Sequence, residues 1–188
     1  MKISLRSIEA FKNISELYIK KILASGELLK FPLGYPINDL NIPNKVAIII
    51  EGEARFFYGN DLNNPKTYKA GKNTFIGLAS ILRVKPCELY TASNEVIALL
   101  ISDELIIDLY TNDNYFRDWC NKELHQSELY EIINILHKLS PKDHLNFNES
   151  INLLSENISI KNIYDDEYIE NPEDYLSIVG SANINEKS

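Results

Sequence analysis

The sequence predicts a mainly β domain, an antiparallel β jelly roll (double-stranded β-helix) with N-terminal helices and a C-terminal helix. Two observations lead to this fold class. Short apolar runs separated by Gly, Pro and Asn clusters fill residues 27–101, and helical apolar patterns stand on both sides of that region. Several short strands at such spacing indicate an antiparallel barrel or jelly roll.

The N-terminal segment predicts two amphipathic helices. The pattern breaks near Asn13-Ile14-Ser15, and Ser15 is a residue type suited to cap the second helix. Apolar residues recur at mostly three- and four-residue steps, the spacing of one helical face. They are Leu5, Ile8, Phe11, Ile14, Leu17, Ile19 and Ile22.

The middle region predicts strands. The runs are Leu28–Leu33, Val46–Ile50, Ala54–Tyr58, Thr67–Lys69, Cys87–Ala92 and Val96–Ile101. Gly52 is free to adopt a positive φ between the second and third runs, so we expect a hairpin over 46–58. Asn60–Pro65 and Ala70–Lys72 predict polar turns.

The helical period returns after Ile101. Ser102 or Asp103 can cap a short helix through Tyr110, and Asn112–Asn114 predicts the start of a longer helix that reaches about Leu139. One stripe of this helix is apolar, at Leu129, Ile132, Ile133 and Leu136. The stripe either packs on the β domain or forms a homodimer seam through 115–139. Phe116, Trp119 and Cys120 are expected to pack inside the domain.

The last part of the chain has a different composition. Residues 141–188 are polar and rich in Asn, so we place the end of the first domain at residue 140. With few helical repeats and little positive charge, this tail does not indicate a helix-turn-helix. Pro172–Ala182 is similar to Pro43–Ala54 if one gap is allowed. The tail is therefore either a polar extension or the start of a second, similar unit.

Composition limits the function classes. A chain of 188 residues is long enough for one ordinary domain and an appendage. The net charge of -8 and the pI near 4.9 argue against a nucleic-acid partner. Two cysteines make no disulfide framework, and no signal peptide or long apolar span is present. We therefore expect a cytoplasmic protein without membrane contact from this segment.

Enzyme chemistry finds little support in the sequence. His125, His137 and His144 all follow the predicted strands, whereas the metal site of a cupin enzyme needs inward-facing histidines on those strands. Cys87 has no base placed beside it by any pattern. A barrel enzyme stays the third hypothesis, and we expect a non-catalytic protein without a metal.

The segment Phe75–Ala92 carries the most specific pattern. It reads Phe-Ile-Gly-Leu-Ala-Ser-Ile-Leu-Arg-Val-Lys-Pro-Cys-Glu-Leu-Tyr-Thr-Ala, with Gly77 and Pro86 nine positions apart. It resembles the phosphate-binding cassette of cyclic-nucleotide-binding domains, the catabolite-activator-like effector domains, which reads roughly Phe-Gly-Glu-Leu-Ala and later Pro-Arg-Ala-Ala. The Gly52 hairpin and the helical entrance over 8–17 resemble the same family.

This resemblance implies a division of labour in the cassette. A short helix offers backbone N–H groups to a cyclic phosphate, an Arg neutralises the phosphate, and a Glu accepts from the ribose. Here Leu78 stands at the Glu position and Cys87 at the Arg position. A buried phosphate without a charge partner costs several kcal/mol. These two exchanges therefore argue against cyclic AMP or cyclic GMP, which remain candidate ligands of the fold.

The candidate ligand-binding set follows from the same resemblance. It consists of Gly77, Leu78, Ala79, Ser80, Arg83, Lys85, Pro86 and Cys87. Arg83 and Lys85 are the positive charges left in the cassette that could reach a bound anion, and Ser80 adds a hydroxyl group.

The function that these residues predict is a non-catalytic regulatory or sensor module with a small-molecule or nucleotide ligand. The alternative is a ligand-free docking module within a larger transporter or signalling protein. The cassette variant also resembles the N-terminal regulatory modules of certain cyanobacterial ATP-binding-cassette peptide exporters, in which a second barrel-like segment follows.

Overall fold

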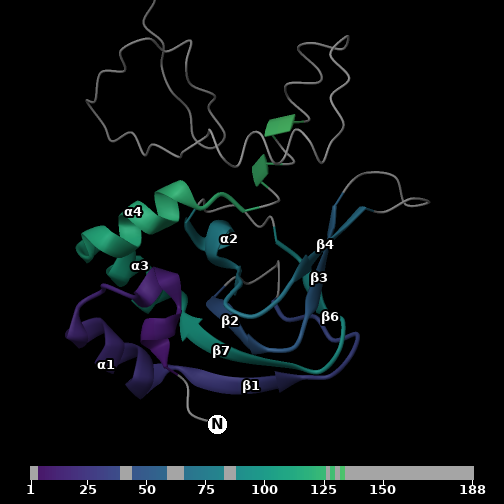
Figure 1. Cartoon of the computed structure of the whole chain (residues 1–188), viewed down its shortest axis with the longest axis horizontal. Coiled ribbons are helices and arrows are strands. Elements are labelled where there is room, and N and C mark those ends of the chain that lie inside the picture. Colours follow the sequence, from purple (N-terminus) through teal and green to yellow (C-terminus); the bar gives the residue numbers. More distant parts are fainter. Residues whose placement is uncertain are drawn as a thin grey trace, which may run out of the picture.

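The computed structural model describes residues 4–38, 44–58, 66–82, 88–125, 128–129 and 132–133. Within these ranges, two antiparallel sheets lie beside a group of helices (Figure 1). The predicted fold class, a jelly-roll-like β domain with helices before and after it, is confirmed. The described strands form two separate sheets, so the closed barrel considered as one form of this fold is not what they build.

The larger sheet has the order β1-β7-β2-β5. Its strands are β1 (Glu27–Phe31), β2 (Lys45–Glu51), β5 (Phe75–Ile76) and β7 (Val96–Ser102). The smaller sheet has the order β4-β3-β6. Its strands are β3 (Ala54–Tyr58), β4 (Lys66–Ala70) and β6 (Tyr90–Ala92). The sequence prediction missed β5, which is only two residues long.

The predicted hairpin over 46–58 is wrong. β2 pairs with β5 and β7, whereas β3 pairs with β4 and β6, so the two strands lie in different sheets. The register of β2 shifts between Ile49 and Glu51, and Gly52 then takes a φ of +93°. An irregularity followed by a left-handed glycine turns the chain out of one sheet and into the other.

The N-terminal segment also differs from the predicted pair of helices. Two short 3-10 helices, η1 (Leu5–Ser7) and η2 (Glu9–Phe11), precede α1 (Glu16–Ser25). Ser15 is the N-cap residue of α1, as predicted, but its side chain makes no capping hydrogen bond. The Arg6 guanidinium instead donates to the carbonyl oxygens of Lys12 and Ile14, at 2.9 and 2.6 Å, and fixes the turn between the helices.

Three further helices complete the described part. α2 (Leu78–Leu82) follows β5, and α3 (Asp103–Asn112) and α4 (Asn114–Lys122) follow β7. Ser102 caps α3, and its oxygen accepts from Leu105 N at 3.4 Å. The predicted long helix from about 114 to 139 is wrong in its continuity, because α4 ends at Lys122 and residues 123–125 are not helical.

Two apolar cores explain why β2 is an unbroken apolar run. Val46 and Ile48 face the helices in one core, and Ala47 and Ile49 face the second sheet in the other. A strand buried on both faces needs no polar alternation. The predicted packing roles of Phe116, Trp119 and Cys120 are confirmed, because they belong to or pack against the first core. Among the apolar residues of the N-terminal pattern, Leu17 is the exception, because it is exposed.

Leu129, Ile132 and Ile133 of the predicted stripe are buried, whereas Leu136 lies outside the described residues. The tail from 141 onward, its boundary at 140 and its similarity to Pro43–Ala54 also lie outside them.

Candidate functional site

The predicted cassette contains one position, Gly77, whose backbone conformation suits glycine. Gly77 lies between β5 and α2 with a φ of +88°. A Cβ atom on Gly77 would lie 3.0 Å from the backbone oxygen of Lys45. The turn is therefore both left-handed and pressed against β2. The predicted part of Gly77 in ligand binding stays a prediction.

The first turn of α2 brings part of the candidate set together. Leu78, Ala79 and Ser80 are all buried there. Leu78 and Ala79 contribute to the wall of a cavity, but neither carries a charge toward it. Arg83, Lys85, Pro86 and Cys87 lie outside the described residues, so their roles stay predictions.

The polar centre of the site is a residue to which the sequence assigned no role, Glu88. Its side chain is completely buried. Its Oε2 atom accepts a hydrogen bond of 2.8 Å from the backbone N–H of Ser80. The Ser80 hydroxyl and the backbone N–H of Gly77 also hydrogen-bond to this carboxyl group. The start of α2 thus holds a carboxylate supplied by the chain itself.

The second oxygen of Glu88 faces a histidine. Oε1 lies 3.2 Å from His125 Nε2. The same ring nitrogen lies 2.7 Å from the hydroxyl oxygen of Tyr90. A ring nitrogen carries either one N–H or one lone pair, so it can serve only one of these two neighbours well. In accord with this, Oε1 of Glu88 makes no hydrogen bond of acceptable geometry.

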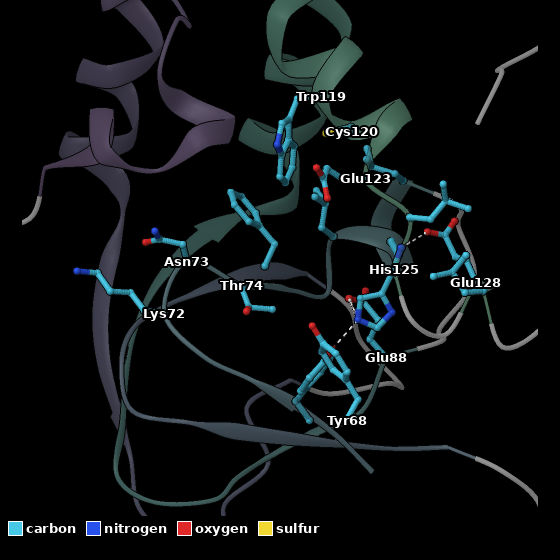
Figure 2. A pocket seen from close by; sticks show the side chains of 17 residues that line it. Tyr68, Lys72, Asn73, Thr74, Glu88, Trp119, Cys120, Glu123, His125 and Glu128 are labelled. Carbon is cyan, nitrogen blue, oxygen red and sulfur yellow. Dashed lines mark hydrogen bonds and ion pairs between the residues drawn. The ribbon is translucent and has the colours of Figure 1, made fainter. Parts of the chain in front are cut away.

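Aromatic rings hold the imidazole in this place. The ring of His125 meets the rings of Phe56 and Tyr90 edge to face, at centroid distances of 5.4 and 5.6 Å. Phe56 lies in β3 and Tyr90 in β6, so the smaller sheet forms the floor beneath the imidazole. Figure 2 shows the His125 side chain beside Glu88.

The backbone of His125 begins the next helical turn. Its N–H donates to Oε2 of Glu128 at 2.9 Å, and its carbonyl oxygen accepts from Leu129 N at 3.1 Å. The bond from the His125 N–H to a carboxylate three positions later corresponds to one half of a capping box. The buried Glu128 is thereby fixed close to the cluster.

Burial governs the protonation of the pair. It raises the pKa of Glu88 to about 7, although the hydrogen bonds from Ser80 and Gly77 act in the opposite direction. The negative charge of Glu128 adds to the rise. Burial also lowers the pKa of His125 to about 4, against the attraction of Glu128. Near neutral pH the histidine is therefore uncharged, and the Glu88 carboxyl group is poised between its two forms.

A cavity of about 380 Å³ opens beside this cluster. Strand β5 of the larger sheet, strands β4 and β6 of the smaller sheet, α2, α4 and residues 123–125 contribute to its lining. Trp119 and Cys120 lie at one end in Figure 2, Tyr68 at the other, and His125 and Glu128 at the side. The cavity falls within the usual range of about 300 to 1,000 Å³ for small-molecule sites.

A weak signal for Glu88 was present in the sequence. Along 88–92 every second residue is buried, namely Glu88, Tyr90 and Ala92, while Leu89 is 41% exposed. Extending the period of β6 back by two positions places Glu88 on the inward face. No local pattern pointed to His125, because its partner Tyr90 stands 35 positions away in the chain.

The described part of the chain contains no group of side chains suited to bind a metal ion. Across those residues no three His, Cys, Asp or Glu side chains gather as a metal site would require. The same residues include no helix with the length and apolar character needed to traverse a bilayer.

No protein-family model and no curated protein matches this chain. Solved structures do match it. The sensor domain of the transcriptional regulator DNR from Pseudomonas aeruginosa aligns with a TM-score of 0.52 and 14% identity, over 76% of this chain and 97% of that one. A longer DNR structure aligns with a TM-score of 0.54 and 15% identity, over 74% of this chain and 66% of that one.

A third match is PfPKA-R (residues 141–441) with bound cAMP. It aligns with a TM-score of 0.51 and 14% identity, over 80% of this chain and 51% of that one. This chain has the cyclic-nucleotide-binding fold. At these identities the likeness concerns the fold, and the chain spans about half the length of PfPKA-R.

The described residues can be compared with the needs of a cyclic nucleotide, the ligand that gives the fold its name. Its phosphate is an anion, and the N–H groups at the start of α2 already hold the Glu88 carboxyl group. Leu78, at the position of the family's glutamate, offers no hydrogen bond to a sugar.

Proposed function

We propose that this chain is a non-catalytic regulatory or sensor module of the cyclic-nucleotide-binding fold whose cassette does not bind a cyclic nucleotide. The observation that carries the proposal is the Glu88 carboxyl group on the N–H groups of Ser80 and Gly77. Two like charges cannot share one buried site without a large cost, so a phosphate would have to expel or protonate Glu88.

Three further points support this function. The fold is one in which DNR has a sensor domain and PfPKA-R has bound cAMP. The cavity beside the cassette is large enough for a small molecule. The described residues offer no metal cluster on which a barrel enzyme would depend.

Titration calorimetry with cyclic AMP and cyclic GMP tests the proposal. We expect no saturable heat with either nucleotide for the unmodified chain. The informative variants restore the family's charges: Leu78→Glu with Cys87→Arg, with and without Glu88→Ala. Binding is expected only when Glu88 is also removed, and thermal melting checks that both variants fold. Saturable binding of either nucleotide to the unmodified chain would refute the proposal.

The second candidate is a ligand-free docking module in a larger transporter or signalling protein, such as a peptide exporter. The position of Glu88 also favours this candidate. Its carboxyl group accepts from the start of α2, so this part of the cassette is ordered without a ligand. Homodimer formation through 115–139 also stays a proposal, now for a segment that is interrupted at 123–125. Ligand binding to the cavity separates the two candidates.

A further inference from the structure

The cavity beside Glu88 combines negative charge with aromatic surface. We propose that it binds a small organic cation, an amidinium or ammonium group carried on a planar or short apolar body. The inference rests on the proposed function, because it names the ligand class of the same site.

Charge is the first argument. Three carboxyl groups line the cavity, those of Glu88, Glu123 and Glu128. Among the described residues that line it, Lys72 is the one lysine or arginine. Lys72 is exposed, and in Figure 2 its side chain extends away from Glu88 and His125. Within the described lining, an anion would meet three carboxyl groups and one exposed lysine, whereas a cation is attracted to the carboxylates.

The second argument is the oxygen Oε1 of Glu88. This atom is buried and lacks a hydrogen bond of acceptable geometry, although the residue lines the cavity. Its neighbour His125 Nε2 lies closer to Tyr90, at 2.7 Å, than to Oε1, at 3.2 Å. Leaving a buried acceptor without a donor is unfavourable. A ligand N–H group directed at Oε1 removes that cost, and a charged N–H group makes the stronger bond.

The third argument is the aromatic part of the lining. Trp119 and Phe75 stand with ring centroids 5.1 Å apart, and Tyr68 also lines the cavity. Aromatic faces attract cations and accommodate planar apolar bodies. A ligand with a charged end toward Glu88 and a flat body toward Trp119 therefore matches both sides of the cavity.

The protonation of the cluster fits a cationic ligand. His125 is buried with a pKa lowered to about 4, so at neutral pH it does not neutralise the carboxyl groups. Glu88, with its pKa raised to about 7, would lose its proton when a cation binds. The other titratable groups that line the cavity are Tyr68, Lys72, Tyr90, Cys120, Glu123 and Glu128.

The experiment uses three probes of the same size and shape but different charge: benzamidine as cation, benzamide as neutral isostere and benzoate as anion. Trp119 is the only tryptophan of the chain and lines the cavity, so its fluorescence reports occupancy directly. Calorimetry at pH 7 measures affinity. We expect benzamidine to bind with a dissociation constant below about 1 mM. Benzamide should bind at least about tenfold more weakly, and benzoate should not bind.

The variant Glu88→Gln should weaken benzamidine binding at least about tenfold, whereas Glu104→Gln, the same exchange at an exposed site on α3, should leave it unchanged. Calorimetry in two buffers of different ionisation heat should show release of a fraction of a proton from unmodified protein, and none from Glu88→Gln. The comparison of probes needs no variant, so it stands even if Glu88→Gln fails to fold.

Several results would overturn the inference. They are equal binding of benzamidine and benzamide, binding of benzoate, no fluorescence change with any probe up to about 10 mM, or unchanged affinity in a folded Glu88→Gln variant. Failure of the proposed function looks different, since it requires saturable binding of a cyclic nucleotide. A chain that binds neither nucleotide nor probe loses only the present inference and favours the docking module.

Discussion

The burial of Glu88 and His125 predicts an unusual dependence of stability on pH. The perturbations are Glu88→Gln, which removes the carboxyl ionisation, and His125→Phe, which keeps a ring between Phe56 and Tyr90 but cannot be protonated. Both side chains are almost completely removed from water, so their pKa shifts translate into stability.

The direction in which Glu88 changes the stability with pH follows from its raised pKa. Below about pH 4.5 the carboxyl group is protonated in the folded and unfolded states, and its ionisation does not affect stability. Between about 4.5 and 7 the unfolded chain loses this proton while the folded chain keeps it, so the free energy of unfolding falls. Because one pH unit corresponds to about 1.4 kcal/mol, the loss approaches about 3 kcal/mol above pH 7.

His125 changes the stability with pH in the opposite direction. Its pKa is lowered from 6.5 to about 4, so above about pH 6.5 it is neutral in both states. As the pH falls below 6.5 the unfolded chain binds a proton that the folded chain refuses, and stability falls, again by about 3 kcal/mol at pH 4. Between about 4.5 and 6.5 the two slopes oppose each other and nearly cancel in the unmodified chain.

Urea denaturation at a series of pH values from about 4 to 8 measures this cancellation. The free energy of unfolding of Glu88→Gln minus that of the unmodified chain should rise with pH by about 3 kcal/mol between 4.5 and 7. For His125→Phe the same difference should fall with increasing pH, because the unmodified chain gains stability as its histidine loses the unfolded-state proton and the variant does not. Differences cancel the contribution of every group that the substitutions do not affect.

A charged Glu88–His125 ion pair would give another result. In that case the pKa of the carboxyl group would lie below its ordinary value, and the Glu88→Gln difference would be flat between pH 4.5 and 7. A flat or falling curve therefore refutes the assignment of a neutral pair.

Three further predictions concern the frame of the site. Gly77→Ala forces a Cβ to within 3.0 Å of the Lys45 oxygen at a φ of +88°, and should cost about 1 to 3 kcal/mol in urea melts; Gly71→Ala, where a Cβ meets nothing within 4 Å, is the control. Phe116→Ala empties the fully buried ring position beside Phe11 and should cost about 3 to 5 kcal/mol, clearly more than Phe116→Leu. Asp113→Ala removes the cap whose oxygen accepts from Phe116 N at 3.0 Å, and should cost about 0.5 to 2 kcal/mol; an unchanged melting temperature would contradict this role.

The sequence was sufficient for most of the fold because strands and helices here follow local patterns. Val46–Ile50 and Val96–Ile101 are apolar runs that became β2 and β7, and Ser102 caps α3 as its position suggested. Sheet partnership is not local. A glycine in a tight turn between two strands is compatible with a hairpin or with a connection between two sheets. Gly52 lies in a connection between two sheets.

The site was predictable only in part, for the same reason. Gly77 and Ser80 were found because a continuous motif carries them. Glu88 escaped because a carboxylate next to a strand is usually solvated, and only the packing of α2 above it makes it buried and hydrogen-bonded. His125 escaped because the helix that was expected to continue past it ends at Lys122, and this break is what turns the ring toward Tyr90.

His125 makes different contacts with its main chain and with its side chain. The helix start uses the backbone N–H and carbonyl oxygen, with Glu128 and Leu129 as partners, while the imidazole lines the cavity beside Glu88 and Tyr90. Exchanging the imidazole therefore alters the wall of the cavity and leaves the helix start intact. Glu128→Gln changes the acceptor of the His125 N–H and also removes one of the three carboxyl groups that line the cavity. Comparing the two variants therefore separates the effect of the ring from the effect of this carboxylate.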